Sequence, residues 1–153
     1  MGLIDFVRAA GEKIFGTSDA SAAPTKDEGV LSKRATALED HVQSLRLPVE
    51  GLKIKVADDV AYVKGLVATQ EIREKVVLAV GNVEGIAKVE DRLEVTSPQP
   101  EARYYTVTKG DTLSKIAKQH YGDANKYPQI FEANKPMLKH PDKIYPGQVL
   151  RIP

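Results

Sequence analysis

Side chains that commonly carry chemistry occur in this chain, but their spacing matches no catalytic or metal site. The three histidines, His41, His120 and His140, show no metal-ligand spacing, and the chain has no cysteine. Disulfides, zinc–thiolate sites and cysteine nucleophiles are therefore excluded. The sequence also lacks Gly-x-Ser-x-Gly, His-Glu-x-x-His and the phosphate-binding P-loop. These observations indicate that the protein is not an enzyme.

One acidic pair, Asp58 and Asp59, is a candidate cation site. Two adjacent carboxylates could bind a hard divalent cation, which prefers oxygen ligands. The same pair is also typical of a solvated turn between two strands. Apolar residues alternate on both sides of the pair, so the pattern favours the turn.

The composition is that of a soluble, folded protein of 153 residues, 42% of them hydrophobic. Its formal net charge of +1 argues against nucleic acid as the main partner. A secretory signal needs an apolar run of about 7–15 residues, but Asp5 and Arg8 interrupt the first run. No segment approaches the ~20 apolar residues that span a bilayer. We therefore expect a cytoplasmic protein without a membrane partner.

Residues 1–15 are expected to form a docked N-terminal helix, because their apolar side chains fall on one helical face. These side chains are Leu3, Phe6, Val7 and Ala10. A small, polar segment at 16–25 reads as a linker. A second connector, at 97–102, contains two prolines that disfavour helix.

Between the connectors, residues 26–96 are predicted to form an α+β unit with the order αββαβ. The first helix carries an apolar stripe, consisting of Leu31, Ala35, Leu38, Val42 and Leu45. Alternating apolar residues predict strands near 52–56, 60–67 and 89–95. Thr69 can cap the second helix, and Gly81 fits the position just after it, where φ is usually positive. The two helices are expected to cover one face of the sheet.

This unit resembles the BON family. The stretches 54–56, 60–67 and 79–89 carry the likeness, and Asp59 departs from it because the family usually has glycine at that turn. BON domains occur in envelope proteins, where interaction with phospholipid or protein is proposed, and in small intracellular proteins. The resemblance alone leaves both settings open.

Residues 103–153 are predicted to fold as a βααβ unit and resemble the LysM family, which usually binds N-acetylglucosamine polymers such as peptidoglycan. The two ends, 104–113 and 144–153, carry the likeness. The resemblance implies a glycan site between two loops, at Gly110, Asp111, Thr112 and Ile144. The alternative is that Gly110 only makes a turn and Thr112 only caps a helix. Without an export signal, peptidoglycan is not the expected partner.

The order BON then LysM, without an export signal, is similar to a narrower family, the small bacterial cytoplasmic BON–LysM potassium-binding proteins. The likeness extends outside both domain cores, to residues 1–13, 131–139 and 141–153. It implies selective binding of K+, with Rb+ or Cs+ as the expected substitutes, and a conformational change on binding. The leading hypothesis is therefore a cytoplasmic K+ sensor or buffer, with its protein partner unknown.

Physical chemistry narrows where the ion could bind. K+ is weakly hydrated, and proteins replace its water shell with neutral carbonyl oxygens, which lack intrahelical partners at helix C-termini. Two segments offer such oxygens, the end of the N-terminal helix and the loop after the second BON helix. The expected ligands are the backbone carbonyls of Val7, Ala10, Glu12, Gly81, Val83 and Ile86. Alternatively, Gly81 and Gly85 serve only as a helix cap and a turn.

Two rival functions remain open. The chain could be an envelope adaptor that binds peptidoglycan through LysM and lipid or protein through BON. It could also be a purely structural protein–protein module. The cellular location discriminates the potassium hypothesis from the adaptor.

Overall fold

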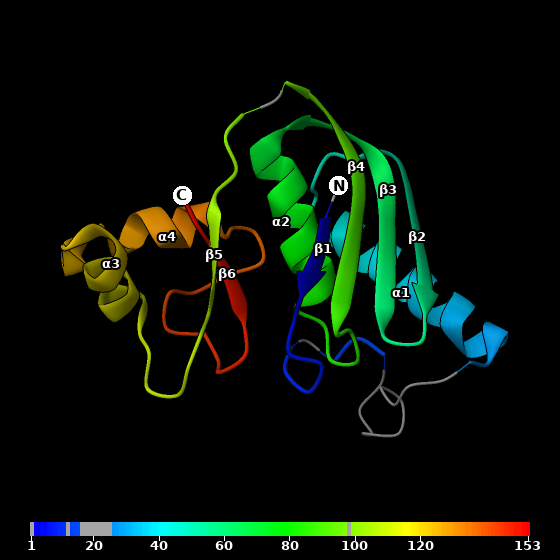
Figure 1. Cartoon of the computed structure of the whole chain (residues 1–153), viewed down its shortest axis with the longest axis horizontal. Helices are drawn as coiled ribbons and strands as arrows, with labels where there is room; N and C mark the ends of the chain where they lie inside the picture. The colour runs from blue at the N-terminus through cyan, green and yellow to red at the C-terminus, as the bar shows by residue number, and fades with distance from the viewer. Residues whose placement is uncertain (1, 12, 16–25, 98) are drawn as a thin grey trace.

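The structure, a computed structural model, describes residues 2–11, 13–15, 26–97 and 99–153. It contains a four-stranded sheet, in the order β1-β4-β3-β2, and a separate two-stranded sheet of β5 and β6. Figure 1 shows that the larger sheet and its helices, α1 and α2, form one domain, and the smaller sheet with α3 and α4 forms another. The expected α+β class and domain order are confirmed.

The first helix of the larger domain, α1 (Glu28–Ser44), begins after Asp27, whose carboxylate accepts a hydrogen bond from the N–H of Val30 at 3.2 Å. Such a cap satisfies one of the helix's orphan N–H groups. The predicted apolar stripe is confirmed, since Leu38 and Val42 are completely buried. The helix therefore packs one face on the sheet.

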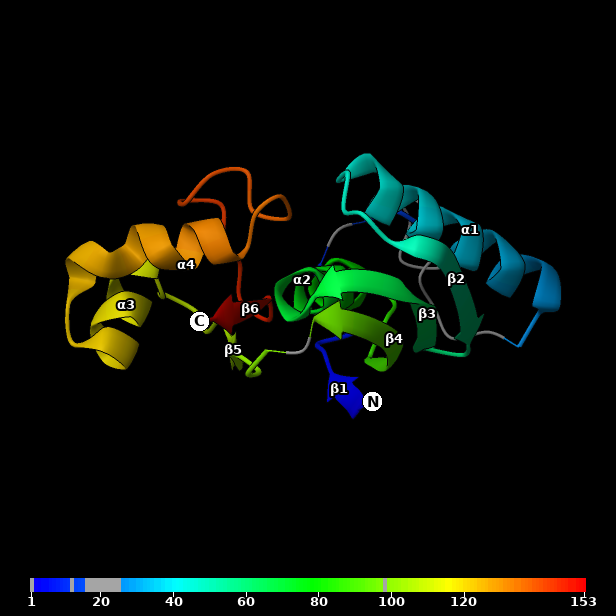
Figure 2. The ribbon, with the colours of Figure 1, turned by 90° about the horizontal axis from the view of Figure 1, so that it is seen from above.

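The sheet follows the predicted alternation. Strands β2 (Glu50–Ala57) and β3 (Val60–Thr69) are antiparallel, and the turn between them consists of Asp58 and Asp59, as predicted. Helix α2 (Gln70–Gly81), capped by Thr69, then crosses over to β4 (Lys88–Ser97), which is parallel to β3. Both helices lie on one face of the sheet, as Figure 2 shows.

The predicted N-terminal helix is wrong. Residues Gly2–Asp5 instead form strand β1, which pairs antiparallel with β4 and extends the sheet by one strand. Leu3 and Val7 of the supposed apolar face are 55% and 42% exposed, and only Phe6 is buried. The edge of β4 offers unpaired backbone groups, and pairing with them satisfies the first residues better than an isolated short helix would.

The smaller domain has the predicted βααβ order. Its elements are β5 (Arg103–Thr106), α3 (Leu113–Tyr121), the 3₁₀ turn η2 (Ala124–Lys126), α4 (Tyr127–Ala133) and β6 (Val149–Ile152). Strands β5 and β6 pair antiparallel, and their core includes Ile116, Ile130 and Leu150. In the part of the chain that the structure describes, no helix is both long enough and apolar enough to cross a membrane.

Candidate functional site

The structure brings the two predicted ion-binding segments together. After β1, the N-terminal segment runs along the loop between α2 and β4. The N–H of Phe6 donates to the carbonyl of Ala87, and the N–H of Gly85 donates to the carbonyl of Arg8, both at 2.8 Å. The segments at 7–11 and 81–86 are therefore neighbours in space, although some seventy residues separate them in the chain.

Gly81 does not have the role predicted from the sequence. It is the last residue of α2 rather than a positive-φ residue after it, and Asn82, with φ −82° and ψ 44°, ends the helix. The reason for glycine is a contact, because a Cβ atom at position 81 would overlap the ring of Phe6. Gly85 has φ 106° and lies in a turn, as the alternative to an ion site predicted. Because Gly81 has no side chain, the N-terminal segment can pack against the C-terminal end of α2.

Gly11 brings the backbones even closer. It has φ 116°, which favours glycine, and a Cβ atom there would lie 2.6 Å from the carbonyl carbon and oxygen of Asn82. Real Cβ atoms do not approach that closely. Any side chain at position 11 would push the N-terminal segment away from the loop after α2.

The predicted carbonyl ligands differ in their hydrogen bonds. The carbonyl of Val7 accepts from the N–H of Ala10 at 3.0 Å, and that of Val83 accepts from Ile86 at 3.1 Å. Each oxygen keeps a second lone pair. The carbonyl of Gly81 has no donor within its helix, which ends at that residue. Glu12 lies outside the described residues.

The surroundings of these carbonyls combine apolar side chains with charged ones, among them Arg8, whose Nε atom is buried. The side chains of Val83 and Ile86 are completely buried, and the nearby Glu84 carboxylate is paired with Lys13 Nζ at 3.7 Å. Across the described ranges there is no group of three histidine or acidic side chains that could hold a metal. Neutral oxygens next to a buried apolar wall suit a monovalent cation better than a divalent one.

The smaller domain supplies a third wall that the sequence did not predict. Gly147 has φ 90°, which fits the predicted turn with Pro146. A Cβ atom at Gly147 would lie 2.7 Å from the Cβ of Ala10 and 3.2 Å from that of Val7. The N-terminal segment is thus held between the loop after α2 and this turn.

Asn82 joins the same loop to the smaller domain. Its side-chain amide donates to the carbonyl of Val149 and its side-chain oxygen accepts from the N–H of Val149, both at 2.8 Å. Asn82 is 4% exposed, and the Val149 side chain packs into the core of the larger domain. A single asparagine in an apolar stretch of the sequence was the signal for this contact, which sequence reasoning missed.

A buried ion pair lies in the same interface. Glu74 of α2 accepts from Arg151 Nε at 2.7 Å and from the N–H of Ala102 at 2.9 Å. Glu74 is only 2% exposed. Burial, together with the carboxylates of Glu74 and Asp91, raises the pKa of Tyr104 well above its usual value. Charges buried this way are kept only when their partners stay in place, so the docking of the two domains is specific.

The four predicted glycan residues all have structural roles. Asp111 accepts from the hydroxyl of Tyr105 at 2.5 Å and from the N–H of Thr108 at 2.9 Å, and these bonds lower the pKa of Asp111. Gly110 lies in a turn, and Thr112 caps α3 by accepting from Lys115 N–H at 3.1 Å. Ile144 packs on the core of the smaller domain. Gly110 and Thr112 thus form the predicted turn and helix cap, and the glycan site implied by the resemblance stays a prediction.

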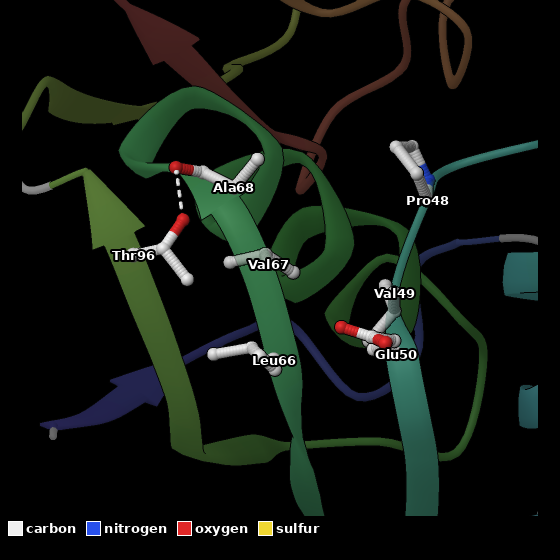
Figure 3. A pocket seen from close by; sticks show the side chains of 7 residues that line it. All are labelled: Pro48, Val49, Glu50, Leu66, Val67, Ala68 and Thr96. Atoms are coloured by element: carbon white, nitrogen blue, oxygen red, sulfur yellow. Dashed lines mark hydrogen bonds between the residues drawn. The ribbon is translucent and has the colours of Figure 1, made fainter.

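A separate pocket lies where β2 begins and β3 ends (Figure 3). Its volume is about 350 Å³. The walls are mostly apolar, and its polar side chains are Glu50 and Thr96, whose hydroxyl donates to the carbonyl of Ala68 at 3.1 Å. One carboxylate without a converging partner does not define a ligand, so this pocket is not the candidate site.

Comparison with known proteins agrees with the domain order. The BON domain model matches residues 31–97, and the LysM domain model matches residues 105–153. The chain is 47% identical to the "Potassium binding protein Kbp" of Escherichia coli O6:H1 over 154 residues, which cover all of this chain and 99% of the relative.

Other relatives match only a part of the chain. An uncharacterized protein of Deinococcus radiodurans is 53% identical over 49 residues, which are 32% of this chain and 19% of that protein. An esterase of Mycobacterium tuberculosis is 47% identical over 53 residues, 35% of this chain and 11% of the esterase. A match to a tenth of an enzyme carries no argument for its activity.

The contact between Gly81 and Phe6 predicts the direction in which an alanine at position 81 changes stability. Alanine normally stabilises a helix interior by about 1 kcal/mol relative to glycine. Gly81→Ala should instead lower the free energy of unfolding by about 1–3 kcal/mol, because the new methyl group meets the ring of Phe6. Urea denaturation followed by circular dichroism measures the change.

Gly29→Ala, in the exposed first turn of α1, is the control: its Cβ would lie 3.2 Å from Oδ1 of Asp27, an exposed side chain that can shift, so the variant should be neutral or stabilising. If the two substitutions shift stability in the same direction, Phe6 does not pack over the end of α2 as described.

The double hydrogen bond of Asn82 generates a second prediction. Asn82→Ala leaves the N–H and the carbonyl of Val149 buried without their partner, and we expect a loss of about 2–4 kcal/mol. Thermal unfolding followed by calorimetry should then resolve two transitions, since the domains no longer melt together. The exposed Asn125→Ala in η2 should leave a single transition.

Proposed function

Because the chain belongs to the family of the potassium binding protein Kbp, we propose that it binds K+ and is not an enzyme. The observation that supports the proposal is the contact between the segments 7–11 and 81–86. Because of this contact, backbone from both segments borders the region where the ion is proposed to bind. The chemistry is reversible binding of an ion, with no covalent step.

The proposed ligands are the backbone carbonyls of Val7, Ala10, Glu12, Gly81, Val83 and Ile86. Gly11 supports this set because it lets its backbone approach that of Asn82, which a side chain would hold apart, and Gly81 admits the Phe6 ring that anchors the N-terminal segment. The negative end of the α2 dipole adds to the attraction for a cation. Rb+ and Cs+, which shed water as easily as K+, should substitute, whereas the more strongly hydrated Na+ should not.

We further propose that binding changes the conformation and that the protein acts in the cytoplasm as a K+ sensor or buffer. The loop that supplies three of the proposed ligands also carries Asn82, which is bonded to Val149 of the smaller domain. The N-terminal segment that supplies the others packs on Gly147. An ion that orders these segments would therefore tighten the docking of the two domains, and the LysM unit would serve as a docking partner.

The ion specificity can be tested by thermal unfolding of metal-stripped protein in K+, Rb+, Cs+, Na+ and choline chlorides at equal ionic strength. An ion that binds only the folded state stabilises it by about 2.7 kcal/mol at one hundred times Kd. K+, Rb+ and Cs+ should raise the midpoint, and Na+ should match choline. Five identical curves would rule the proposal out.

The location of the site can be tested with two positive-φ glycines. Gly11→Ala forces a methyl group against the backbone of Asn82, whereas Gly51 has φ 64° and nothing within 4 Å of the added methyl. Both substitutions strain the backbone, but only the first should weaken K+ binding, by about tenfold or more, equivalent to 1.4 kcal/mol. Isothermal titration calorimetry with KCl measures Kd for each variant. Equal affinities in the two variants would place the ion elsewhere.

A further inference from the structure

A basic pocket lies between the two domains, at the C-terminal end of α1. One wall consists of Ser44, Leu45 and Arg46 from the larger domain, and the other comes from the loop after α4, with Lys135, Pro136, Leu138 and Lys139. Figure 2 shows the end of α1 facing this loop. The volume is about 520 Å³, within the range of pockets for small molecules.

The wall from the smaller domain is rigidly anchored. Asn134 is 1% exposed, and its amide donates to the carbonyls of Ile130 and Arg151, while its oxygen accepts from the N–H of Arg151. The N–H of Leu138 donates to the carbonyl of Asn134 at 2.8 Å, and Leu138 is 2% exposed. The backbone that bears Lys135 and Lys139 is thus fixed.

The wall from the larger domain contains a residue in an unusual conformation. Arg46 has φ 58°, and its N–H donates to the carbonyl of Gln43 at 2.9 Å, which closes the end of α1. Glycine is the usual residue at such a left-handed position after a helix. Arginine there costs stability that glycine would not, and the chain uses it where its side chain lines the pocket.

The charges that line this pocket are all positive. Lys135 Nζ has a counter-ion, Glu132, at 2.8 Å, and lies 4.6 Å from the centre of the Phe131 ring. Within the described residues, neither Arg46 nor Lys139 forms an ion pair, and no acidic side chain lines the pocket. The two unbalanced charges of Arg46 and Lys139 beside a concave, partly apolar surface produce a positive potential. An anion would relieve their mutual repulsion.

We propose that this pocket binds a small molecule that carries phosphoryl groups. Arg46 presents a planar guanidinium suited to bidentate contact with phosphate oxygens, and Lys135 and Lys139 supply point charges from the facing wall. Leu45, Pro136 and Leu138 provide apolar surface for an organic part. The site is separate from the proposed potassium ligands and does not rest on the potassium proposal.

The full-length protein can be tested by titration with pyrophosphate and with ADP, with NaCl as the reference at matched ionic strength. Backbone amide signals in nuclear magnetic resonance spectra should shift at residues 44–46, 135 and 137–139. A ligand that reaches ten times its Kd should raise the unfolding midpoint by about 3–6 °C. Shifts confined to other surfaces, or none beyond those with NaCl, would overturn the proposal.

Two variants with equal net charge separate a built site from general attraction. The double substitution Arg46→Gln and Lys139→Gln should weaken binding of pyrophosphate at least tenfold. The control, Lys118→Gln with Lys126→Gln on exposed surface of the smaller domain, should change it less than twofold. Equal weakening in both would mean that only net charge attracts the anion.

Arg46→Gly gives a third, independent readout. Glycine at this left-handed position should raise the midpoint of thermal unfolding, while the loss of the guanidinium weakens binding of pyrophosphate. A variant that is more stable and still binds pyrophosphate with unchanged affinity would remove Arg46 from the site.

Discussion

The packing of Phe6 against the end of α2 is the contact on which the arrangement of this protein depends. The ring of Phe6 fits only because position 81 has no side chain, and it anchors a segment that would otherwise have no core of its own. Once anchored, β1 completes the sheet on β4, and residues 7–11 lie along the loop after α2. A surface helix end thereby becomes a junction between distant parts of the chain.

The same junction explains why the two domains form one unit. The backbone of Val149 is bonded to Asn82, its side chain lies in the core of the larger domain, and Arg151 neutralises the buried Glu74. Buried polar groups that are fully paired specify one arrangement, because any other leaves them unsatisfied. The free-energy cost of separating the two domains is therefore concentrated in a few residues.

The chemistry of the proposed ion site follows from what surrounds it. The buried side chains beside it, Val83 and Ile86, are apolar, the nearby carboxylate of Glu84 has a lysine partner, and Arg8 adds one cation from the N-terminal segment. Such a site distinguishes ions by the ease with which they lose water rather than by charge. The smaller domain contributes to this site because its turn at Pro146 and Gly147 lies against Ala10. Its loop at residues 110–112, where the LysM resemblance implied a glycan site, is held by hydrogen bonds of Asp111 and Thr112.

The sequence by itself determined both domain folds. The apolar stripe of α1, the alternation in β2 to β4, the caps at Thr69 and Thr112 and the turn at Asp58–Asp59 were all predictable, because each depends on neighbours within a few residues. The contact between two remote glycine-containing segments was also predicted, from the free carbonyls expected at two helix ends together with the family resemblance, although the first of those helices does not form. The tertiary structure alone decided three things. Residues 2–5 form a strand because the edge of β4 is available. Gly81 is required by a ring from the other end of the chain. Asn82 and Gly147 join the domains. Each is a contact between residues far apart in sequence, and local patterns carry no information about which distant partner will occupy an open edge or fill the space a missing side chain leaves.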